Sequence, residues 1–172
     1  MKNRRIVIVG FMGSGKTTVA EALALQLDCG MIDLDSFITK REGRSPAKII
    51  AQDGEPAFRR IETDALLEVL EKKEVRVIAL GGGAWTSEVN RALITQRDCL
   101  SVWLDAPFEL CWERISSSVT DRPLAPDRAS AERLYNDRRV SYELSERHLR
   151  VSREDSAKKL GDKILNGDSK AI

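Results

Sequence analysis

The stretch GFMGSGKT at residues 10–17 matches a phosphate-binding loop, with four free positions between two glycines and then a lysine and a threonine. The residues around it fit the same motif. The β-branched run Arg5–Val9 before it predicts a buried strand. The segment Thr17–Leu27 after it predicts a helix with an apolar residue at every fourth position. Strand, glycine loop and helix together predict a site for nucleotide phosphates.

The residue types of this loop suit an anion. Gly13 and Gly15 allow backbone conformations closed to other residues, so consecutive N–H groups can point at phosphate oxygens. The start of the helix adds a partial positive charge. Lys16 brings a cation to the outer phosphates, and the Thr17 hydroxyl can ligate Mg²⁺. A glycine turn that opens a helix by chance is the alternative, but so long a match is rare in a chain of ordinary composition.

Length and composition restrict the class of protein. A chain of 172 residues predicts one domain with its own core. Its net charge of +1, from 28 basic and 27 acidic residues, implies neither a nucleic-acid partner nor a membrane surface. Cys29, Cys99 and Cys111 lack metal-ligand spacing and are expected to be reduced thiols of a cytoplasmic protein. No stretch approaches the ~20 apolar residues of a membrane span.

Strand-like runs alternate with helical patterns, which predicts an α/β fold with a parallel sheet covered by helices on both faces. The other strands are expected at Met31–Leu34, Val75–Leu80, Leu100–Leu104 and His148–Ser152. Further helices are expected over Pro56–Lys72, over Ser130–Glu146 and from Asp155 to about Leu165, with Asn166–Ile172 as a frayed polar tail.

Two polar stretches lack the pattern of packed scaffold. One runs from about Phe37 to Gly54. The other, Ser116–Arg128, is rich in serine, contains two prolines and has no helical periodicity. It is either an exposed connector or a mobile lid over the nucleotide. We favour the lid, because phosphoryl transfer requires that water be excluded.

Two features lie at the ends of predicted strands, where ligands gather in a parallel α/β sheet. Asp33 and Asp35 end the second strand and are expected to share one face, about 7 Å apart. One carboxylate could serve Mg²⁺ through water while the other contacts a substrate hydroxyl, or Asp35 could cap the next helix. The run Gly81–Gly83 follows the third strand, and three glycines predict close approach of a ligand.

Arginines complete the candidate site, because a guanidinium fork suits a carboxylate or a phosphate. They are Arg59 and Arg60 early on a helix, Arg122 in the expected lid, and Arg138 and Arg139 on the long helix that carries Tyr142. The only histidine, His148, is interpreted as structural. One histidine and these cysteines exclude a histidine-based triad or a zinc site.

Taken together, these pieces resemble the shikimate kinase family. The segments that carry the resemblance are GFMGSGKTT at Gly10–Thr18, DLD at Asp33–Asp35, DGEPAFRRIE at Asp53–Glu62, GGGA at Gly81–Ala84, DRPLA at Asp121–Ala125 and RRVSY at Arg138–Tyr142. They span nearly the whole chain in family order. The phosphate loop alone is unspecific, but the FRR, GGG and RPL pieces together are highly specific.

The resemblance implies a P-loop three-layer sandwich of the nucleoside-monophosphate-kinase-like type, with a five-stranded parallel sheet of order 2-3-1-4-5. It implies ATP-dependent phosphorylation of the 3-hydroxyl of shikimate, in the route to chorismate and the aromatic amino acids. The implied partners are ATP, Mg²⁺ and shikimate, for a monomeric cytoplasmic enzyme. Its substrate region would lie at about residues 33–62 and its lid at about 116–128.

The resemblance also implies roles for individual residues. Asp35 is similar to the aspartate that contacts the substrate hydroxyls, either as a base or only as an orienting group. Arg59 and Arg138 resemble the pair that binds the substrate carboxylate, with Arg139 as the alternative to Arg138. The remaining substrate contacts would come from the backbone of Gly81 and Gly82.

On the nucleotide side, Thr17 and Asp33 match the magnesium positions, and Lys16 and Arg122 join Asp35 as the catalytic set. The implied ATP-binding residues are Gly13, Ser14, Gly15, Lys16, Thr17, Thr18, Arg114, Arg122 and Arg153. The chain departs from the family pattern at Trp85, where a small aliphatic residue is common. It also departs at Val140 and Ser141, where the family often has proline and leucine.

Three other functions compete with this one. A gluconate-type sugar-acid kinase shares the fold and the phosphate loop, but the GGG run and the FRR segment argue against it. A GTP-dependent switch needs an N-K-x-D guanine signature, and the sequence contains no such string. A catalytically silent binding module is disfavoured because Lys16, Asp33, Asp35 and Arg122 are all present.

Overall fold

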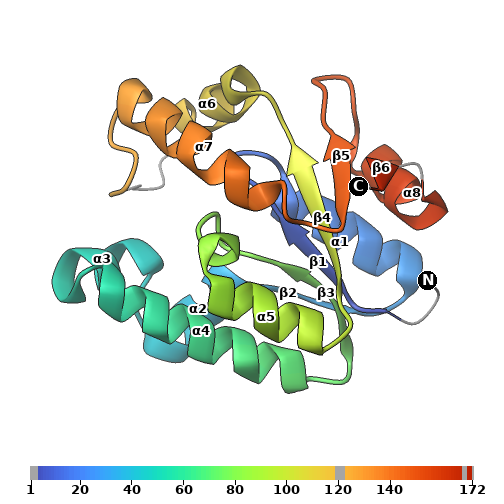
Figure 1. The fold of residues 1–172 in the computed structure, drawn as a ribbon, viewed down its shortest axis with the longest axis horizontal. Coiled ribbons are helices and arrows are strands. Elements are labelled where there is room, and N and C mark those ends of the chain that lie inside the picture. The colour runs from blue at the N-terminus through green and yellow to red at the C-terminus, as the bar shows by residue number, and fades with distance from the viewer. Residues whose placement is uncertain (1–3, 119–122, 168–169, 172) are drawn as a thin grey trace.

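A computed structural model describes residues 4–118, 123–167 and 170–171 of the chain (Figure 1). Its centre is a sheet whose strands follow the order β2-β3-β1-β4-β5-β6. The bounds are Ile6–Val9 for β1, Gly30–Asp33 for β2, Val75–Ala79 for β3, Leu100–Asp105 for β4, Arg147–Arg150 for β5 and Lys170–Ala171 for β6. The first five strands are parallel, so the predicted order 2-3-1-4-5 is confirmed.

Helices cover both faces of the sheet (Figure 1). Their bounds are Lys16–Leu27 for α1, Leu34–Glu42 for α2, Pro46–Asp53 for α3, Glu55–Glu71 for α4, Glu88–Gln96 for α5, Phe108–Ser116 for α6, Arg128–Tyr142 for α7 and Ala157–Asn166 for α8. A short 3₁₀ turn, η1, spans Ala84–Thr86. The helices predicted around α1, α4, α7 and α8 are confirmed, most ends lying within two residues of the prediction.

The central position of β1 follows from its composition. All four of its residues are apolar and at most 5% exposed, as expected for a strand covered on both faces. It pairs with β3 on one side and β4 on the other. The glycine loop that follows β1 therefore lies at the middle of the carboxyl edge of the sheet, with the ends of β3 and β4 on either side and that of β2 beyond β3.

The polar stretch Phe37–Gly54 is packed scaffold, and the prediction that it is not was wrong. It forms most of α2 and all of α3, with Gly43 between them in the left-handed conformation. Ser45 caps α3 by accepting a hydrogen bond from the N–H of Lys48. A few buried apolar side chains are enough to hold both short helices against α4. They are Leu34, Ile38 and Ile49.

Near the end of the chain the structure also differs from the expectation. Residues 166–172 were expected to be a frayed tail, but α8 continues to Asn166 and β6 pairs antiparallel with the neighbouring strand β5. In the expected lid, α6 ends at Ser116 and α7 begins at Arg128. Arg122 lies outside the described residues. None of the described helices is long and apolar enough to cross a membrane.

Candidate active site

A cavity of about 690 Å³ lies at the carboxyl ends of β1, β2 and β3, and this volume is typical of small-molecule sites. The phosphate loop, the beginnings of α1 and α2, and one side of α4 line it. Most of the predicted site residues lie along its wall: Gly13, Gly15, Lys16, Thr17, Thr18, Asp33, Asp35, Arg59, Gly81, Gly82, Arg114 and Arg138.

The glycine loop has the conformation that its sequence predicts. Gly13 and Gly15 have φ values of 77° and 97°, which disfavour any residue with a side chain. A Cβ added to Gly13 would lie 2.6 Å from the carbonyl oxygen of Cys111, so α6 packs directly against the loop. The Lys16 ammonium donates a hydrogen bond of 2.8 Å to the carbonyl of Phe11 and bends back along the loop.

Ser14 is the one loop residue of the predicted ATP site that does not line the cavity. Its side chain is buried at 1% exposure, and its Oγ has no hydrogen-bond partner among the described residues. Its backbone N–H donates to the carbonyl of Phe11 at 3.2 Å. The side chain of Ser14 is therefore buried beneath the loop and not at the cavity.

Asp33 and Asp35 occupy different elements. Asp33 is the last residue of β2 and Asp35 lies in the first turn of α2, so the expectation that they share a strand face was wrong. The cap of α2 is Asp33, whose Oδ1 accepts from the N–H of Ser36 at 3.0 Å, and not Asp35. The two carboxylates are placed by different elements because the chain turns from strand to helix between them.

The other oxygen of Asp33 accepts a 2.6 Å hydrogen bond from the Thr17 hydroxyl. A hydroxyl and a carboxylate in contact at the cavity wall are hard oxygen donors of the type that Mg²⁺ prefers. The described residues contain no group of three or more histidine, cysteine, aspartate or glutamate side chains that could hold a metal ion. This donor pair therefore fits a metal that takes its remaining ligands from phosphates and water.

The three glycines after β3 form the floor of the site, and each leaves room for a different side chain. None of the three has a positive φ, so the backbone freedom of glycine is not required there. What matters at these positions is the absence of a Cβ. A Cβ on Gly81 would lie 2.5 Å from Oδ1 of Asp35, and one on Gly82 would lie 3.4 Å from Nη1 of Arg138. A Cβ on Gly83 would collide with the Arg59 guanidinium.

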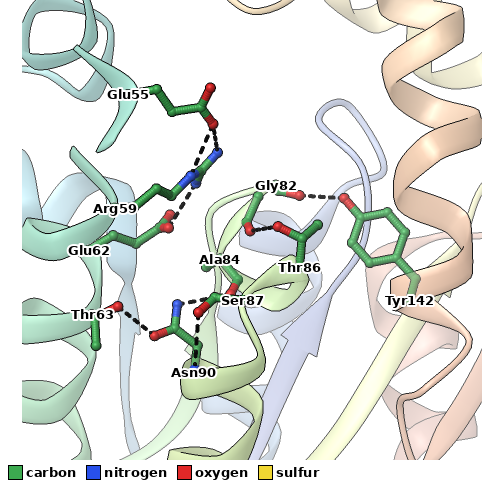
Figure 2. A network of polar contacts seen from close by, with 11 residues as sticks. Glu55, Arg59, Glu62, Thr63, Gly82, Ala84, Thr86, Ser87, Asn90 and Tyr142 are labelled. Carbon is green, nitrogen blue, oxygen red and sulfur yellow. Dashed lines mark hydrogen bonds and ion pairs between the residues drawn. The ribbon is translucent and has the colours of Figure 1, made fainter. Parts of the chain in front are cut away.

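Arg59 is held by two carboxylates of its own helix (Figure 2). Its guanidinium lies 2.7 Å from Glu55 and 2.8 Å from Glu62, which are four residues before it and three after it. The side chain of Glu62 is only 1% exposed. Burial raises the pKa of Glu62, and the charge of Arg59 opposes that rise.

Arg138 and Arg139 point to different places. Arg138 lines the cavity and is 6% exposed. Arg139 instead lies 3.0 Å from Asp105, within hydrogen-bond distance of Tyr135 and over the ring of Trp103. Of the two candidates for the carboxylate ligand, Arg138 is therefore the one at the site.

Burial lowers the pKa of Arg138, and the nearby positive charge of Arg59 acts in the same direction. Within residues 4–118 and 123–167, no carboxylate forms an ion pair with Arg138. A buried guanidinium that the chain leaves without a carboxylate favours an anionic ligand.

The arginines expected at the nucleotide differ in their positions. Arg114, on α6, lines the cavity and donates a 3.0 Å hydrogen bond to the carbonyl of Gly13. Arg153 is exposed, pairs with Glu113 and does not line the cavity. Pro123 and Leu124, which follow Arg122, do line it.

The sequence analysis missed several residues of the site. Glu55 and Glu62 were part of a recognised segment but had no role, although their helical spacing from Arg59 signals ion pairs. An apolar part of the wall was also missed, because two of its residues lie in the polar stretch Phe37–Gly54, which was not expected to be packed scaffold. Those wall residues are Pro46, Ile50 and Phe58.

Comparisons with known proteins agree with this geometry. The family model described as shikimate kinase matches residues 12–167. The shikimate kinase of Geobacillus thermodenitrificans is 31% identical over 172 residues, covering 96% of this chain and 88% of that protein. The structure of shikimate kinase from Acinetobacter baumannii in complex with shikimate superposes with a TM-score of 0.86 at 33% identity, covering 96% of this chain and 92% of that one.

A gluconokinase from Sinorhizobium meliloti 1021 also has a similar structure, with a TM-score of 0.58 at 16% identity over 95% of this chain and 90% of that one. A likeness at this identity shows the shared fold alone, so the gluconate-type alternative is not favoured. By sequence along nearly its whole length and by its fold, the chain belongs to the shikimate kinase family.

Proposed function

We propose that this chain transfers the γ-phosphoryl group of ATP to the 3-hydroxyl of shikimate, giving shikimate 3-phosphate and ADP. The observation that carries the proposal is the buried Arg138, which has no carboxylate partner in the described chain and shares a cavity with Arg59 and the phosphate loop. A substrate that brings its own carboxylate supplies the partner that the described chain does not give to Arg138. Its hydroxyl can then lie beside the nucleotide.

On the substrate side, Arg59 and Arg138 would bind the carboxylate, and Gly81 and Gly82 would let the ring approach the backbone closely. Asp35 would contact the hydroxyl that reacts. Phosphoryl transfer passes through a loose transition state in which the nucleophile needs little activation. Asp35 can therefore serve by orienting the hydroxyl as well as by taking its proton.

On the nucleotide side, the loop amides, Lys16 and Arg114 would bind the phosphates, and Arg122 would reach them from the lid. Thr17 and Asp33 would hold Mg²⁺. The ion, when bound, neutralises charge on the phosphate oxygens. The proposal treats the whole chain as one kinase domain of a monomeric cytoplasmic enzyme. The single kinase domain is supported by the shikimate kinase family model, which matches residues 12–167.

The test is steady-state turnover with ATP and Mg²⁺ on a panel of shikimate, gluconate and nucleoside monophosphates. Among these acceptors, we expect turnover only of shikimate. Efficient phosphorylation of gluconate or of a nucleotide, with none of shikimate, would overturn the proposal.

Arg138 and Arg139 offer a matched pair of variants for the same assay. Lysine keeps the charge but loses the planar fork. Arg138→Lys should raise KM for shikimate by about tenfold or more, the cost of one charge-assisted hydrogen bond, with KM for ATP unchanged. Arg139→Lys should change KM for shikimate by no more than a few-fold. A larger effect at Arg139 would reverse the assignment.

A further inference from the structure

The glycine floor continues directly into η1, and this short segment is connected to the two helices that carry the substrate arginines (Figure 2). Arg59 lies on α4 and Arg138 on α7. The turn η1 packs against both helices, which have little direct contact with each other. The distance between the two guanidinium groups therefore depends on how firmly each helix is attached to this segment.

The attachment to α4 runs through buried amide and hydroxyl groups. The Thr63 hydroxyl, four residues after Arg59, donates to Oδ1 of Asn90 at 2.8 Å. The amide of Asn90 then donates to the carbonyl of Ala84 at 2.9 Å, and Asn90 is 1% exposed. This arrangement links the cavity-facing side of α4 to the beginning of η1.

The attachment to α7 consists of two hydrogen bonds that run in opposite directions. The indole N–H of Trp85 donates to the carbonyl of Ser141 at 2.9 Å, and the hydroxyl of Tyr142 donates to the carbonyl of Gly82. Trp85 is 3% exposed and Tyr142 is 1% exposed, so water does not compete for either bond. Burial raises the pKa of Tyr142, which keeps its hydroxyl protonated as a donor.

Both acceptor and donor on α7 lie close to Arg138 along the helix. Ser141 and Tyr142 are three and four residues after it, one helical turn away on the same side. A shift of this last turn would therefore move the Arg138 guanidinium with it. Displacements of about 1 Å at a substrate-binding group can cost ~100-fold in rate.

We infer that Trp85 is a positioning residue, whose indole N–H fixes α7 against the glycine floor and so sets the place of Arg138 opposite Arg59. The inference rests on the proposed function, because its readout is the binding of a carboxylate substrate. An aliphatic residue at this position could fill space but could not donate to Ser141. The role of Trp85 is therefore tied to its N–H as well as to its volume.

The test is Trp85→Phe, which keeps an aromatic ring and removes the donor. We expect KM for shikimate to rise about tenfold, with KM for ATP unchanged and kcat within about threefold, as for loss of one buried hydrogen bond. Trp112→Phe is the control, since Trp112 lies on α6, stacks on Phe108 and is not among the residues that line the cavity. It should leave both KM values unchanged.

A double-mutant cycle separates positioning from general packing. If Trp85 acts through Arg138, then Trp85→Phe should have little further effect on KM for shikimate in an Arg138→Lys background. Additive effects, an unchanged KM for shikimate, or an equal rise in both KM values would overturn the inference.

Tyr142→Phe provides a second route if Trp85→Phe does not accumulate as folded protein. It retains the ring and removes the hydroxyl, which donates to Gly82 and also interacts with Arg138 itself, and the same selective rise in KM for shikimate is expected. An unchanged KM in that variant also contradicts the inference. Absence of shikimate turnover by the wild-type enzyme contradicts the proposed function itself, so the two failures are distinguishable.

Discussion

At the scale of single residues, Asp33 and Asp35 have separable tasks. Asparagine is as good a helix cap as aspartate, so Asp33→Asn should preserve α2 while it weakens the dependence of turnover on Mg²⁺. Asp35→Asn should lower kcat by roughly 10²–10⁴-fold, the usual contribution of a general base, with shikimate still bound. Turnover measured across a magnesium titration checks both. An intact kcat in Asp35→Asn with none in Asp33→Asn would show that the two roles are reversed.

The glycine floor allows a second test at this scale. A Cβ on Gly81 would reach the carboxylates of Asp35 and Glu62, which are ends of side chains that can move aside. Gly81→Ala should therefore fold with nearly unchanged stability but lose at least about tenfold in kcat/KM, because Asp35 is displaced. Gly82→Ala, whose Cβ would keep 3.4 Å from its nearest protein atoms, should leave Asp35 in place, so its effect should appear in KM for shikimate and not in kcat. Equal kinetics for the two variants would contradict this account.

At the scale of elements, Asp155 joins the end of β5 to α8. Its carboxylate accepts from the backbone and hydroxyl of Ser152, both at 2.9 Å, and lies 2.9 Å from Lys159 and 3.1 Å from Lys163. Its side chain is 5% exposed. Burial alone would raise the pKa of Asp155, but these hydrogen bonds hold it well below the ordinary value.

A lowered pKa in the folded state means that the carboxylate stabilises the protein only while it is ionised. Asp155→Asn should lower the free energy of unfolding by about 2 kcal/mol at pH 7, as for loss of hydrogen bonds to a charged group. The deficit should be complete above about pH 4 and shrink as the pH falls further. Urea denaturation of both proteins at pH 7 and pH 3 measures it. A deficit of the same size at both values would assign the effect to packing.

The elements that sequence patterns predicted are those with strong local signals. The β-branched run of β1 and the glycine loop decide the fold without help from the rest of the chain. The short helices α2, α3, α5 and α6 were not predicted individually, because each buries only a few side chains and much of its stability comes from neighbours. The choice between Arg138 and Arg139 depends on which way α7 is rotated about its axis. Tertiary contacts accompany that rotation, since Tyr142 packs near Trp103 and Arg139 pairs with Asp105.

At the scale of the whole molecule, we propose that the segment 116–128, between α6 and α7, acts as a lid over the nucleotide. Its far end is anchored where Arg128 pairs with Glu109 and lies over the ring of Phe108. We expect hydrogen exchange in residues 116–128 to slow when ADP and shikimate are both bound, with α8 unchanged as the internal control. Arg122→Ala should lower kcat with little change in KM for shikimate. Equal protection of residues 116–128 with and without ligands would contradict the lid.

The strand order also has a consequence for synthesis of the protein. The strand made first, β1, lies in the middle of the sheet, with Ile6 opposite both Val77 and Leu100. Its neighbours β3 and β4 leave the ribosome much later, so the apolar β1 stays unpaired until they have been synthesised. Such long-range pairing favours slow folding and contact with chaperones. The glycine loop is likewise shaped by α6, through the backbone of Cys111 against Gly13. A nascent chain therefore gains its nucleotide site only after α6 has emerged.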